Sequence, residues 1–265
     1  MPLYEDTALL IYSCVLAFVL GACTGSFLNC AAWRIARGES FIKGRSRCPA
    51  CGHTLGLPDL VPVFSWIFLR GKCRHCKTRI PARYLVTELL FALVTVACLL
   101  RFGITVAALR NWIFVCCLFC LSLVDLDAYI IPNGCLVTAA LVWAAALPFV
   151  EEPLTALWKG LLSGFVYGAG LLLVSLLLDK ILKKDTLGGG DIKLFAVIGL
   201  YLGLIGTLFS VIFACVLGLL FVPLRRALKK EGEQIPFGPA IAASATLMLL
   251  FGSALVNWYN SLLGI

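Results

Sequence analysis

Charged side chains are scarce in this sequence. Lysine and arginine together number 22 and aspartate and glutamate 14 among 265 residues, whereas 61% of the residues are hydrophobic. The mean hydropathy is +0.99. So few charges would cover a soluble surface poorly, which excludes an ordinary soluble domain. We therefore expect an all-α polytopic membrane protein.

Three sequence patterns are missing as well. The chain has no glycine-rich strand-turn-helix pattern of the nucleotide-binding kind and no clear internal repeat of the transporter kind. Its first apolar stretch lacks a convincing small-residue cleavage site and is followed by a basic loop. We expect this stretch to be a retained membrane helix and not a removed signal peptide.

Apolar stretches fill most of the chain and are long enough to cross a hydrocarbon core of about 30 Å. The stretch 192–224 is ambiguous, because it is too long for one untilted helix and short for two. Two short crossings hinged near Gly203 to Gly206 place the basic loops on one side of the membrane, and this charge placement favours the division. This division predicts about eight transmembrane helices. The stretches are 8–30, 84–100, 111–131, 133–150, 153–178, 192–224 and 238–262.

The basic residues are concentrated in three predicted loops, 31–83, 179–193 and 225–236, which hold 19 of the 22 lysines and arginines. With eight helices these loops share one side of the membrane, and such a bias marks the cytoplasmic side. Both termini are then expected outside. The net charge of +8 is a topology signal, and we expect the lipid bilayer but no nucleic acid as a partner.

The first of these loops carries two C-x2-C pairs separated by 21 residues. Each pair can form a tight knuckle, and four thiolates complete a closed zinc site that stabilises a loop too small for much of a core. A pair of disulfides is the alternative, disfavoured in a reducing compartment. His53 and His75 are expected beside the site and not as ligands. The predicted ligands are Cys48, Cys51, Cys73 and Cys76.

Aspartates lie at the cytoplasmic ends of two predicted helices. Asp125 and Asp127 lie deep in the stretch 111–131, and their spacing places them on nearly opposite sides of a helix. Asp191 follows three glycines and begins another helix, where the macrodipole favours a carboxylate. Asp125 and Asp191 can therefore act as a pair, in which one acid activates water and the other, protonated, donates to a peptide carbonyl.

Structural roles are the alternative for each of these polar residues. Asp191 can cap a turn between two membrane helices, and basic residues such as Lys193 can neutralise the buried acids. Glu88 is either a functional residue within the second apolar stretch or an interfacial partner of Arg83 or another basic residue. Asn29 is expected to bond to a neighbouring helix.

These motifs occur in an order that resembles the bacterial type IV prepilin peptidases, a group of GxGD aspartyl proteases, over most of the chain. The sequence departs from their common pattern at Gly56-Leu57-Pro58, within the loop that links the two cysteine pairs. Besides those pairs, the matching segments are Gly25-Ser26-Phe27-Leu28-Asn29 with Arg34, Pro62-Val63-Phe64-Ser65-Trp66, Leu69-Arg70-Gly71-Lys72-Cys73, Arg83-Tyr84 with Glu88, Asp125 with Pro132-Asn133, Gly188-Gly189-Gly190-Asp191-Ile192-Lys193-Leu194 and Pro236-Phe237-Gly238-Pro239.

The resemblance implies a peptidase with Asp125 and Asp191 as its catalytic pair and Asp127 outside that pair. The substrate would be a prepilin or pseudopilin, whose short basic leader is removed at the cytoplasmic face of the bacterial inner membrane. N-methylation of the new N-terminus with S-adenosylmethionine would follow, and the residues indicate no site for that cofactor. The expected substrate-binding residues are Gly188, Gly189, Gly190 and Lys193.

The chain is accordingly divided into a first transmembrane helix (1–30), a cytoplasmic zinc-binding loop (31–83) and a membrane-embedded peptidase core (84–265). Two other functions are considered. An intramembrane protease of the same chemistry would cut signal or receptor segments, but the cysteine loop and the Pro236-Phe237-Gly238-Pro239 segment argue against it. A proton-coupled transporter would use the same aspartates as proton carriers.

Overall fold

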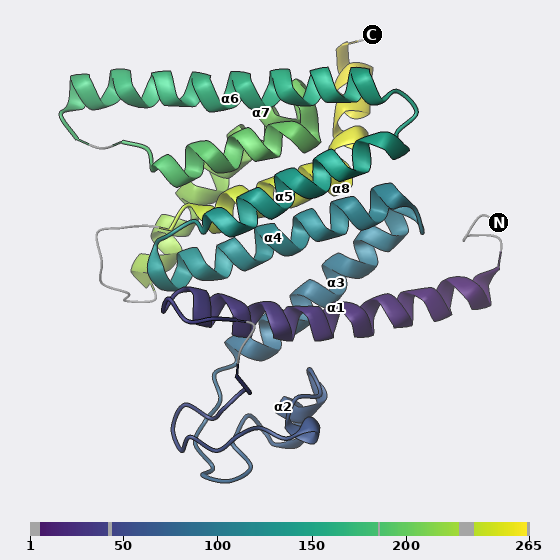
Figure 1. Ribbon diagram of the computed structural model, residues 1–265, viewed down its shortest axis with the longest axis vertical. Coiled ribbons are helices and arrows are strands. Elements are labelled where there is room, and N and C mark those ends of the chain that lie inside the picture. The colour runs from purple at the N-terminus through teal and green to yellow at the C-terminus, as the bar shows by residue number, and fades with distance from the viewer. Residues whose placement is uncertain (1–5, 42–43, 185, 228–235, 264–265) are drawn as a thin grey trace. The chain divides into compact units, whose positions relative to one another are not determined.

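The computed structural model describes residues 6–41, 44–184, 186–227 and 236–263. Within these ranges the chain is helical apart from the cysteine loop and short connections, and its only bridge pairs lie in that loop (Figure 1). Most of the predicted basic loop 225–236 lies outside the described residues. The helices are α1 (Thr7–Ile35), α2 (Phe64–Phe68), α3 (Arg83–Phe102), α4 (Val106–Ala128), α5 (Asn133–Ala146), α6 (Pro153–Leu182), α7 (Gly189–Ala227) and α8 (Gly238–Leu263).

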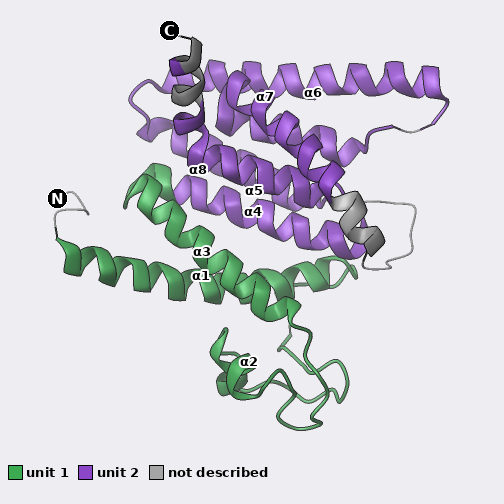
Figure 2. Ribbon diagram, turned by 180° about the vertical axis from the view of Figure 1, so that it is seen from behind, with its two compact units in different colours: residues 1–108 green, residues 109–265 purple. Residues whose placement is uncertain are grey.

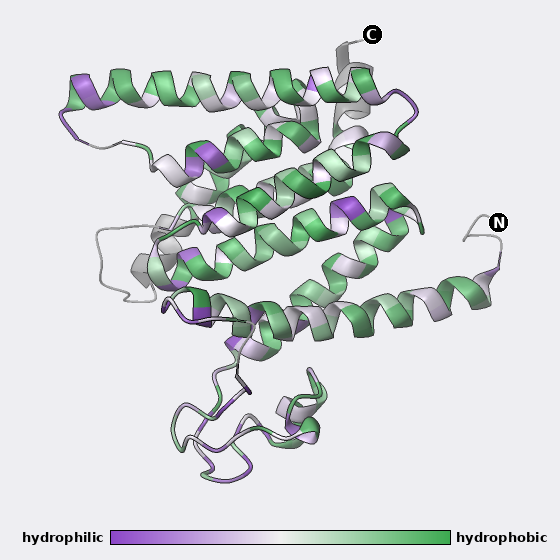
Figure 3. Cartoon of the chain, in the orientation of Figure 1, coloured by the Kyte–Doolittle hydropathy of each residue, from purple (hydrophilic) through white to green (hydrophobic). Residues whose placement is uncertain are grey.

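Six described helices, namely α1, α3, α4, α6, α7 and α8, are long and apolar enough to cross a membrane. Helix α5 and the short 3-10 turn after it form another apolar segment, Asn133–Phe149. Hydrophobic residues dominate these helices, whereas hydrophilic residues gather in loops and near helix ends (Figure 3). The prediction of an all-α polytopic membrane protein is confirmed.

Helix α7 is broken at Gly203, whose φ of 67° and ψ of −174° are not helical. The Thr207 hydroxyl donates to the Gly203 carbonyl at 2.6 Å, and the Tyr167 hydroxyl of α6 donates to the Leu204 carbonyl at 2.7 Å. These bonds satisfy backbone groups that the kink would otherwise expose to lipid. The break lies within the predicted hinge. With α7 counted as two segments and α5 included, eight apolar segments are described.

The chain forms two compact units, residues 1–108 and 109–265, which we call unit 1 and unit 2 (Figure 2). The domain boundaries after residues 30 and 83 stay predictions.

In unit 1, small residues let α1 and α3 approach closely. A Cβ atom on Gly21 would lie 2.7 Å from the Ala92 Cα atom, and one on Gly25 would also meet α3. One turn further along α1, the Asn29 amide donates to the Thr87 hydroxyl, as predicted for this polar residue. Close backbone approach and an interhelical hydrogen bond are the usual means of pairing helices in a membrane.

In unit 2, α7 packs against α5, α6 and α8. The contact with α6 depends on glycines spaced four residues apart in α6, Gly160, Gly164 and Gly168. A Cβ atom on Gly199 of α7 would lie 2.8 Å from the Gly164 backbone nitrogen. The buried core consists of Phe114, Cys117, Leu118 and Leu121 of α4, Leu136 and Ala139 of α5, Leu194, Phe195, Ile198 and Ala214 of α7, and Ile241, Ala242 and Ala245 of α8.

Candidate functional site

Asp125 is held in place by the start of another helix. It is 6% exposed, and its Oδ2 atom accepts a hydrogen bond of 2.8 Å from the backbone N–H of Gly238, the first residue of α8. A Cβ atom on Gly238 would lie 2.7 Å from the same oxygen, so this approach requires glycine. The positive end of the α8 dipole is therefore directed at the carboxylate of α4.

The end of α4 determines which of its aspartates faces the interior. Tyr129 adopts a left-handed conformation (φ 57°), and its N–H donates to the Asp125 carbonyl at 3.0 Å. This hydrogen bond ends α4 with an αL cap. Pro132 then precedes the start of α5. Asp127 is exposed, whereas Asp125 is buried. The prediction that the two acids project to opposite sides is confirmed.

Asp191 lies in the first turn of α7, as predicted. Its N–H donates to the Gly188 carbonyl at 3.0 Å, and its Oδ2 atom would be 3.2 Å from a Cβ atom on Gly188, so the carboxylate folds back over bare backbone. A Cβ atom on Gly190 would lie 3.0 Å from the Ile131 Cβ atom. Gly190 therefore lets the start of α7 pack against the connection between α4 and α5.

Asp179 of α6 anchors the loop that precedes these glycines. Thr186 donates from both its backbone N–H and its hydroxyl to Asp179 Oδ1 of α6, each at 2.7 Å. Sequence reasoning missed this anchor, although an acid near the end of a helix and a threonine after it are a recognisable pair. The bonds restrain the approach of the chain to Gly188.

Both predicted catalytic aspartates lie in unit 2, Asp125 near the end of α4 and Asp191 in the first turn of α7. The two carboxyl groups are near enough for an electrostatic interaction, and Asp191 is half-buried. Lys193 is exposed, and its Nζ atom donates to Asn133 Oδ1 at 3.5 Å, which links the starts of α7 and α5. An apolar groove of about 360 Å³ between these helices is lined by Asn133, Leu136, Val137, Ala140, Lys193 and Val197.

The four predicted cysteine ligands form one cluster in unit 1, where their Sγ atoms all lie within 4.8 Å of one another. The Cys48 and Cys76 sulfurs are 3.8 Å apart. Tetrahedral Zn–S bonds of about 2.3 Å place sulfurs about 3.8 Å apart, so the cluster can hold a metal ion. None of the thirteen cysteines, all of which lie among the described residues, forms a disulfide bond. The ring centroids of His53 and His75 lie 3.5 Å apart.

The two C-x2-C segments fold as matching knuckles. Cys48 N–H donates to the His53 carbonyl and Cys73 N–H to the Thr78 carbonyl, both at 2.9 Å. The fourth residue after each first cysteine, Gly52 or Lys77, has a positive φ. Hydrogen bonding with Thr78 lowers the pKa of Cys76 to about 6. This favours the thiolate, the form in which cysteine binds metal.

Glu88 joins the cysteine loop to α3. Its buried Oε2 atom accepts a hydrogen bond of 2.7 Å from the Val63 N–H, and Val63 has a φ of 65°. A charge-assisted bond to backbone can hold such an uncommon conformation. The interaction joins residues 25 positions apart. Sequence reasoning considered a functional role or a basic side-chain partner for Glu88, and no backbone partner.

Two family models match separate parts of the chain, and the gap between their matches includes the boundary between unit 1 and unit 2. Residues 19–102 match the family model described as the bacterial peptidase A24 N-terminal domain. Residues 112–222, which include both Asp125 and Asp191, match the model of the type IV leader peptidase family. No solved structure gave a significant match.

Several curated relatives carry the name prepilin leader peptidase/N-methyltransferase. The one from Bacillus subtilis (strain 168) is 35% identical over 246 residues, which cover 91% of this chain and 96% of the relative. The one from Myxococcus xanthus (strain DK1622) is 36% identical over 213 residues, which cover 78% of this chain and 63% of the relative. The one from Burkholderia pseudomallei (strain 1026b) is 32% identical over 265 residues, which cover 89% of this chain and 85% of the relative.

Proposed function

The chain belongs to the type IV leader peptidase family, and we propose that it is a membrane-embedded aspartyl endopeptidase that removes the short leader from prepilins or pseudopilins. The observation that carries this proposal is the pair of carboxylates in unit 2, one buried on α4 and bonded to Gly238, the other opening α7 beside bare glycine backbone. The names of the relatives extend the proposal to N-methylation of the new N-terminus. The transporter alternative finds no support in the comparisons.

Two interacting carboxylates can divide acid and base roles between them. Because neighbouring negative charges repel, Asp125 and Asp191 would share one proton in the resting site. The ionised carboxylate accepts a proton from the water that attacks the scissile carbonyl, and the protonated one donates to the carbonyl oxygen. The N–H of Gly238 keeps Asp125 oriented while this proton moves.

Bare backbone and apolar surface adjoin these acids and suit a substrate that has both an extended leader and a hydrophobic helix. Gly188 and Gly189 are exposed, so an extended peptide can lie against their backbone. Gly190 shapes the same turn by packing against Ile131. Lys193 stands at the mouth of the apolar groove between α5 and α7, and that groove suits the hydrophobic helix.

The membrane location follows from the helices and the family, and we assign the chain to the bacterial inner membrane as a multi-pass protein. Lysine and arginine in the loops 31–83, 179–193 and 225–236 favour a cytoplasmic site and external termini. The leader would then be cut where the hydrophobic helix of the substrate meets the cytoplasm.

We assign zinc to the cysteine cluster, because four thiolates at tetrahedral spacing match its preference and form a closed site. A closed zinc site supplies a structural cross-link and no water for catalysis. S-adenosylmethionine would supply the methyl group. In that transfer the new N–C bond forms as the C–S bond breaks, its electron pair returns to sulfur, and the amine releases one proton.

Cleavage of a prepilin with a basic leader tests the peptidase assignment. We expect Asp125→Asn and Asp191→Asn each to lower the cleavage rate in detergent by about 10²- to 10⁴-fold, because each removes one proton-transferring group. Asp127→Asn is the matched control, since Asp127 lies on the same helix but is exposed. Full activity of either active-site variant would overturn the proposed mechanism.

A further inference from the structure

Residues 57–69 of the cysteine loop, which we call the apolar segment, are largely hydrophobic. Nine of the 13 residues are apolar, and Asp59 is the only ionisable one. The segment comprises the 3-10 turn Leu57–Asp59 and the short helix α2. Apolar stretches of about 10–14 residues are too short to cross a bilayer and are typical of buried, re-entrant or interfacial segments. The segment is therefore unusual for a loop expected to lie wholly in the cytoplasm.

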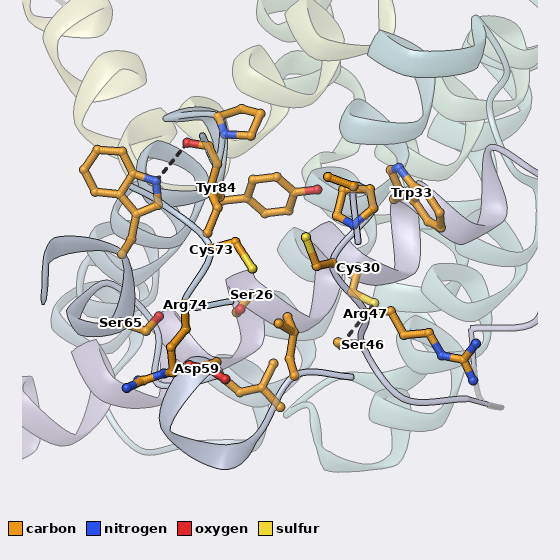
Figure 4. A pocket seen from close by; sticks show the side chains of 18 of the residues that line it. Ser26, Cys30, Trp33, Ser46, Arg47, Asp59, Ser65, Cys73, Arg74 and Tyr84 are labelled. Carbon is orange, nitrogen blue, oxygen red and sulfur yellow. Dashed lines mark hydrogen bonds and ion pairs between the residues drawn. The ribbon is translucent and has the colours of Figure 1, made fainter. Parts of the chain in front are cut away.

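The apolar segment has two different faces. One face, which includes Asp59 and Ser65, lines a cavity of about 710 Å³ in unit 1. Figure 4 shows these two side chains on the wall of the cavity together with Arg74. The other face consists of large side chains that do not line the cavity, and those in α2 are spaced three or four residues apart, on one side of a helix. Their exposed fractions are 82% for Leu57, 56% for Phe64, 52% for Ile67 and 80% for Phe68.

The apolar segment packs beside the membrane helices of unit 1 and not beyond their ends. Val63 belongs to a buried cluster with Ala22 of α1 and Ala92 of α3. Ala22 lies 13 residues before the end of α1, and Ala92 lies nine residues after the start of α3. At a rise of about 1.5 Å per residue, these distances are about 20 Å and about 14 Å. Helix α3 is about as long as the hydrocarbon core is thick, roughly 30 Å, so Val63 lies at the depth of that core.

The helices that support Val63 expose apolar side chains at the same depth. Leu20 of α1 lies two residues from Ala22, and Leu93 of α3 lies next to Ala92, and each is more than half exposed. Both helices are candidate membrane spans, whose exposed apolar side chains suit the acyl chains of lipid. The outer face of the apolar segment continues this apolar surface of unit 1 and therefore fits the same surroundings.

Polar groups of the apolar segment are paired within the chain, which suits a segment surrounded by lipid. The N–H of Val63, whose backbone is not helical, donates to the buried Glu88 carboxylate at 2.7 Å. The Trp66 Nε1 atom donates to the Ile80 carbonyl at 3.3 Å. Backbone N–H groups within and after α2 donate to carbonyls four residues earlier, at 3.0 to 3.1 Å, namely those of Ser65, Ile67 and Leu69. Acyl chains offer no hydrogen bonds, so non-helical backbone at this depth needs such internal partners.

Basic residues follow the apolar segment directly. Residues 70–83 contain six lysines and arginines and no acid, and the first two, Arg70 and Lys72, are exposed. The one acid of the segment, Asp59, is already paired with Arg74 at 2.7 Å. Clusters of lysine and arginine beside a membrane segment on its cytoplasmic side attract anionic headgroups. Long basic side chains can reach those headgroups while their stems lie along apolar surface.

We propose that the apolar segment is immersed in the cytoplasmic leaflet of the membrane and that its partner is anionic phospholipid. Its outer face contacts acyl chains, and Arg70 and Lys72 bind the phosphates above them. The inference rests on the cytoplasmic position proposed for the loop and on neither of the proposed enzymatic activities. The cysteine loop is then attached to the bilayer at three places, the end of α1, the start of α3 and the apolar segment.

Photo-crosslinking from position 68 tests the proposal in the full-length protein, reconstituted in liposomes of equal parts phosphatidylethanolamine and phosphatidylglycerol. With p-benzoylphenylalanine in place of Phe68, we expect lipid adducts at a yield similar to that from position Leu93 and at least about fivefold above that from Ser40. Ser40 is the matched control, because it is exposed and follows the end of α1. Phosphatidylglycerol should exceed phosphatidylethanolamine in the adducts by at least about twofold, and Arg70→Gln with Lys72→Gln should remove that excess.

A lipid yield no higher at position 68 than at Ser40 would overturn the proposal. Crosslinks from position 68 to residues 109–265 or to an added prepilin, in place of lipid, would also overturn it, because another part of the chain or the substrate would then cover the outer face. Lipid adducts in the bulk proportion would overturn the role given to Arg70 and Lys72.

Labelling of the wild type with an aryl diazirine dissolved in the acyl chains is a second measurement that does not depend on the folding of variants. Label in peptides from residues 57–69, at a level similar to that in α3, supports the proposal. Label in α3 that is absent from residues 57–69 overturns it. Neither measurement uses cleavage or methylation, so its failure is distinguishable from a failure of the proposed function, which the aspartate variants test.

Discussion

The contact between Gly238 and Asp125 leads to a sharp prediction for Gly238→Ala. The added methyl carbon would lie 2.7 Å from Asp125 Oδ2 and 3.1 Å from both Cβ and Cγ of that side chain. Ordinary contacts begin at 3.4 Å, so the carboxylate oxygen must move by about 0.7 Å or the start of α8 must shift. Either movement lengthens the 2.8 Å hydrogen bond that orients Asp125.

A displacement of this size is large for a proton-transferring group. Misplacement by about 1 Å can lower a reaction rate by about 10²-fold. We therefore expect kcat for leader removal to fall by about 10- to 100-fold. KM should change little, because the groove and the glycine backbone proposed to contact substrate lie on α5 and at the start of α7. The free energy of unfolding should fall by at most about 1.5–3 kcal/mol, the value of one hydrogen bond to a charged group.

Initial rates of prepilin cleavage over a range of substrate concentrations separate kcat from KM. Gly170→Ala is the matched control, because it makes the same change in α6 at a position where a Cβ atom has no neighbour within 4 Å. Wild-type kcat in Gly238→Ala, with the variant folded, would refute the view that this close approach positions Asp125. A large rise in KM alone would assign Gly238 to substrate binding instead.

Two further predictions concern metal and packing. Metal analysis of the wild type should find close to one zinc ion per chain, lost in Cys48→Ser with Cys73→Ser but kept in Cys23→Ser, whose thiol is outside the cluster. Freshly reduced wild-type protein without metal would contradict the zinc assignment. Gly199→Val should lower stability by about 1–3 kcal/mol, because its side chain would meet the backbone of Gly164 in α6. Thermal unfolding compares it with Gly170→Val, and equal melting temperatures would argue against tight packing of α6 on α7.

Features that depend on local pattern could be predicted from the sequence. Apolar length predicts the membrane helices, and the placement of basic residues predicts that the stretch 192–224 is divided near Gly203. The C-x2-C spacing predicts the four-sulfur cluster, and glycines followed by an acid predict Asp191 in a first helical turn. Each of these features depends on the spacing of residues that are close together in the sequence. Their relative positions are set by local chain geometry and not by distant contacts.

Features that depend on distant partners could not be predicted in the same way. The bond from Gly238 to Asp125 joins residues 113 positions apart, and that from Val63 to Glu88 joins a loop to a helix. Periodicity fixes the face on which a side chain lies but not the backbone group it meets. The cavity of unit 1 is likewise assembled from α1, the cysteine loop and α3, and no single segment indicates it.

The glycines at Gly188, Gly199 and Gly238 have one physical role in common. At each position a Cβ atom would meet the carboxylate of Asp125 or Asp191, or the backbone of a neighbouring helix, at 3.2 Å or less. Their absent side chains thus allow close approach at three places, the loop before Asp191, the α6 contact of α7 and the start of α8, of which the first and the last adjoin the two acids. Precise placement of two acids within a membrane helix bundle therefore depends on close backbone approach, because few other polar groups are available there to orient them.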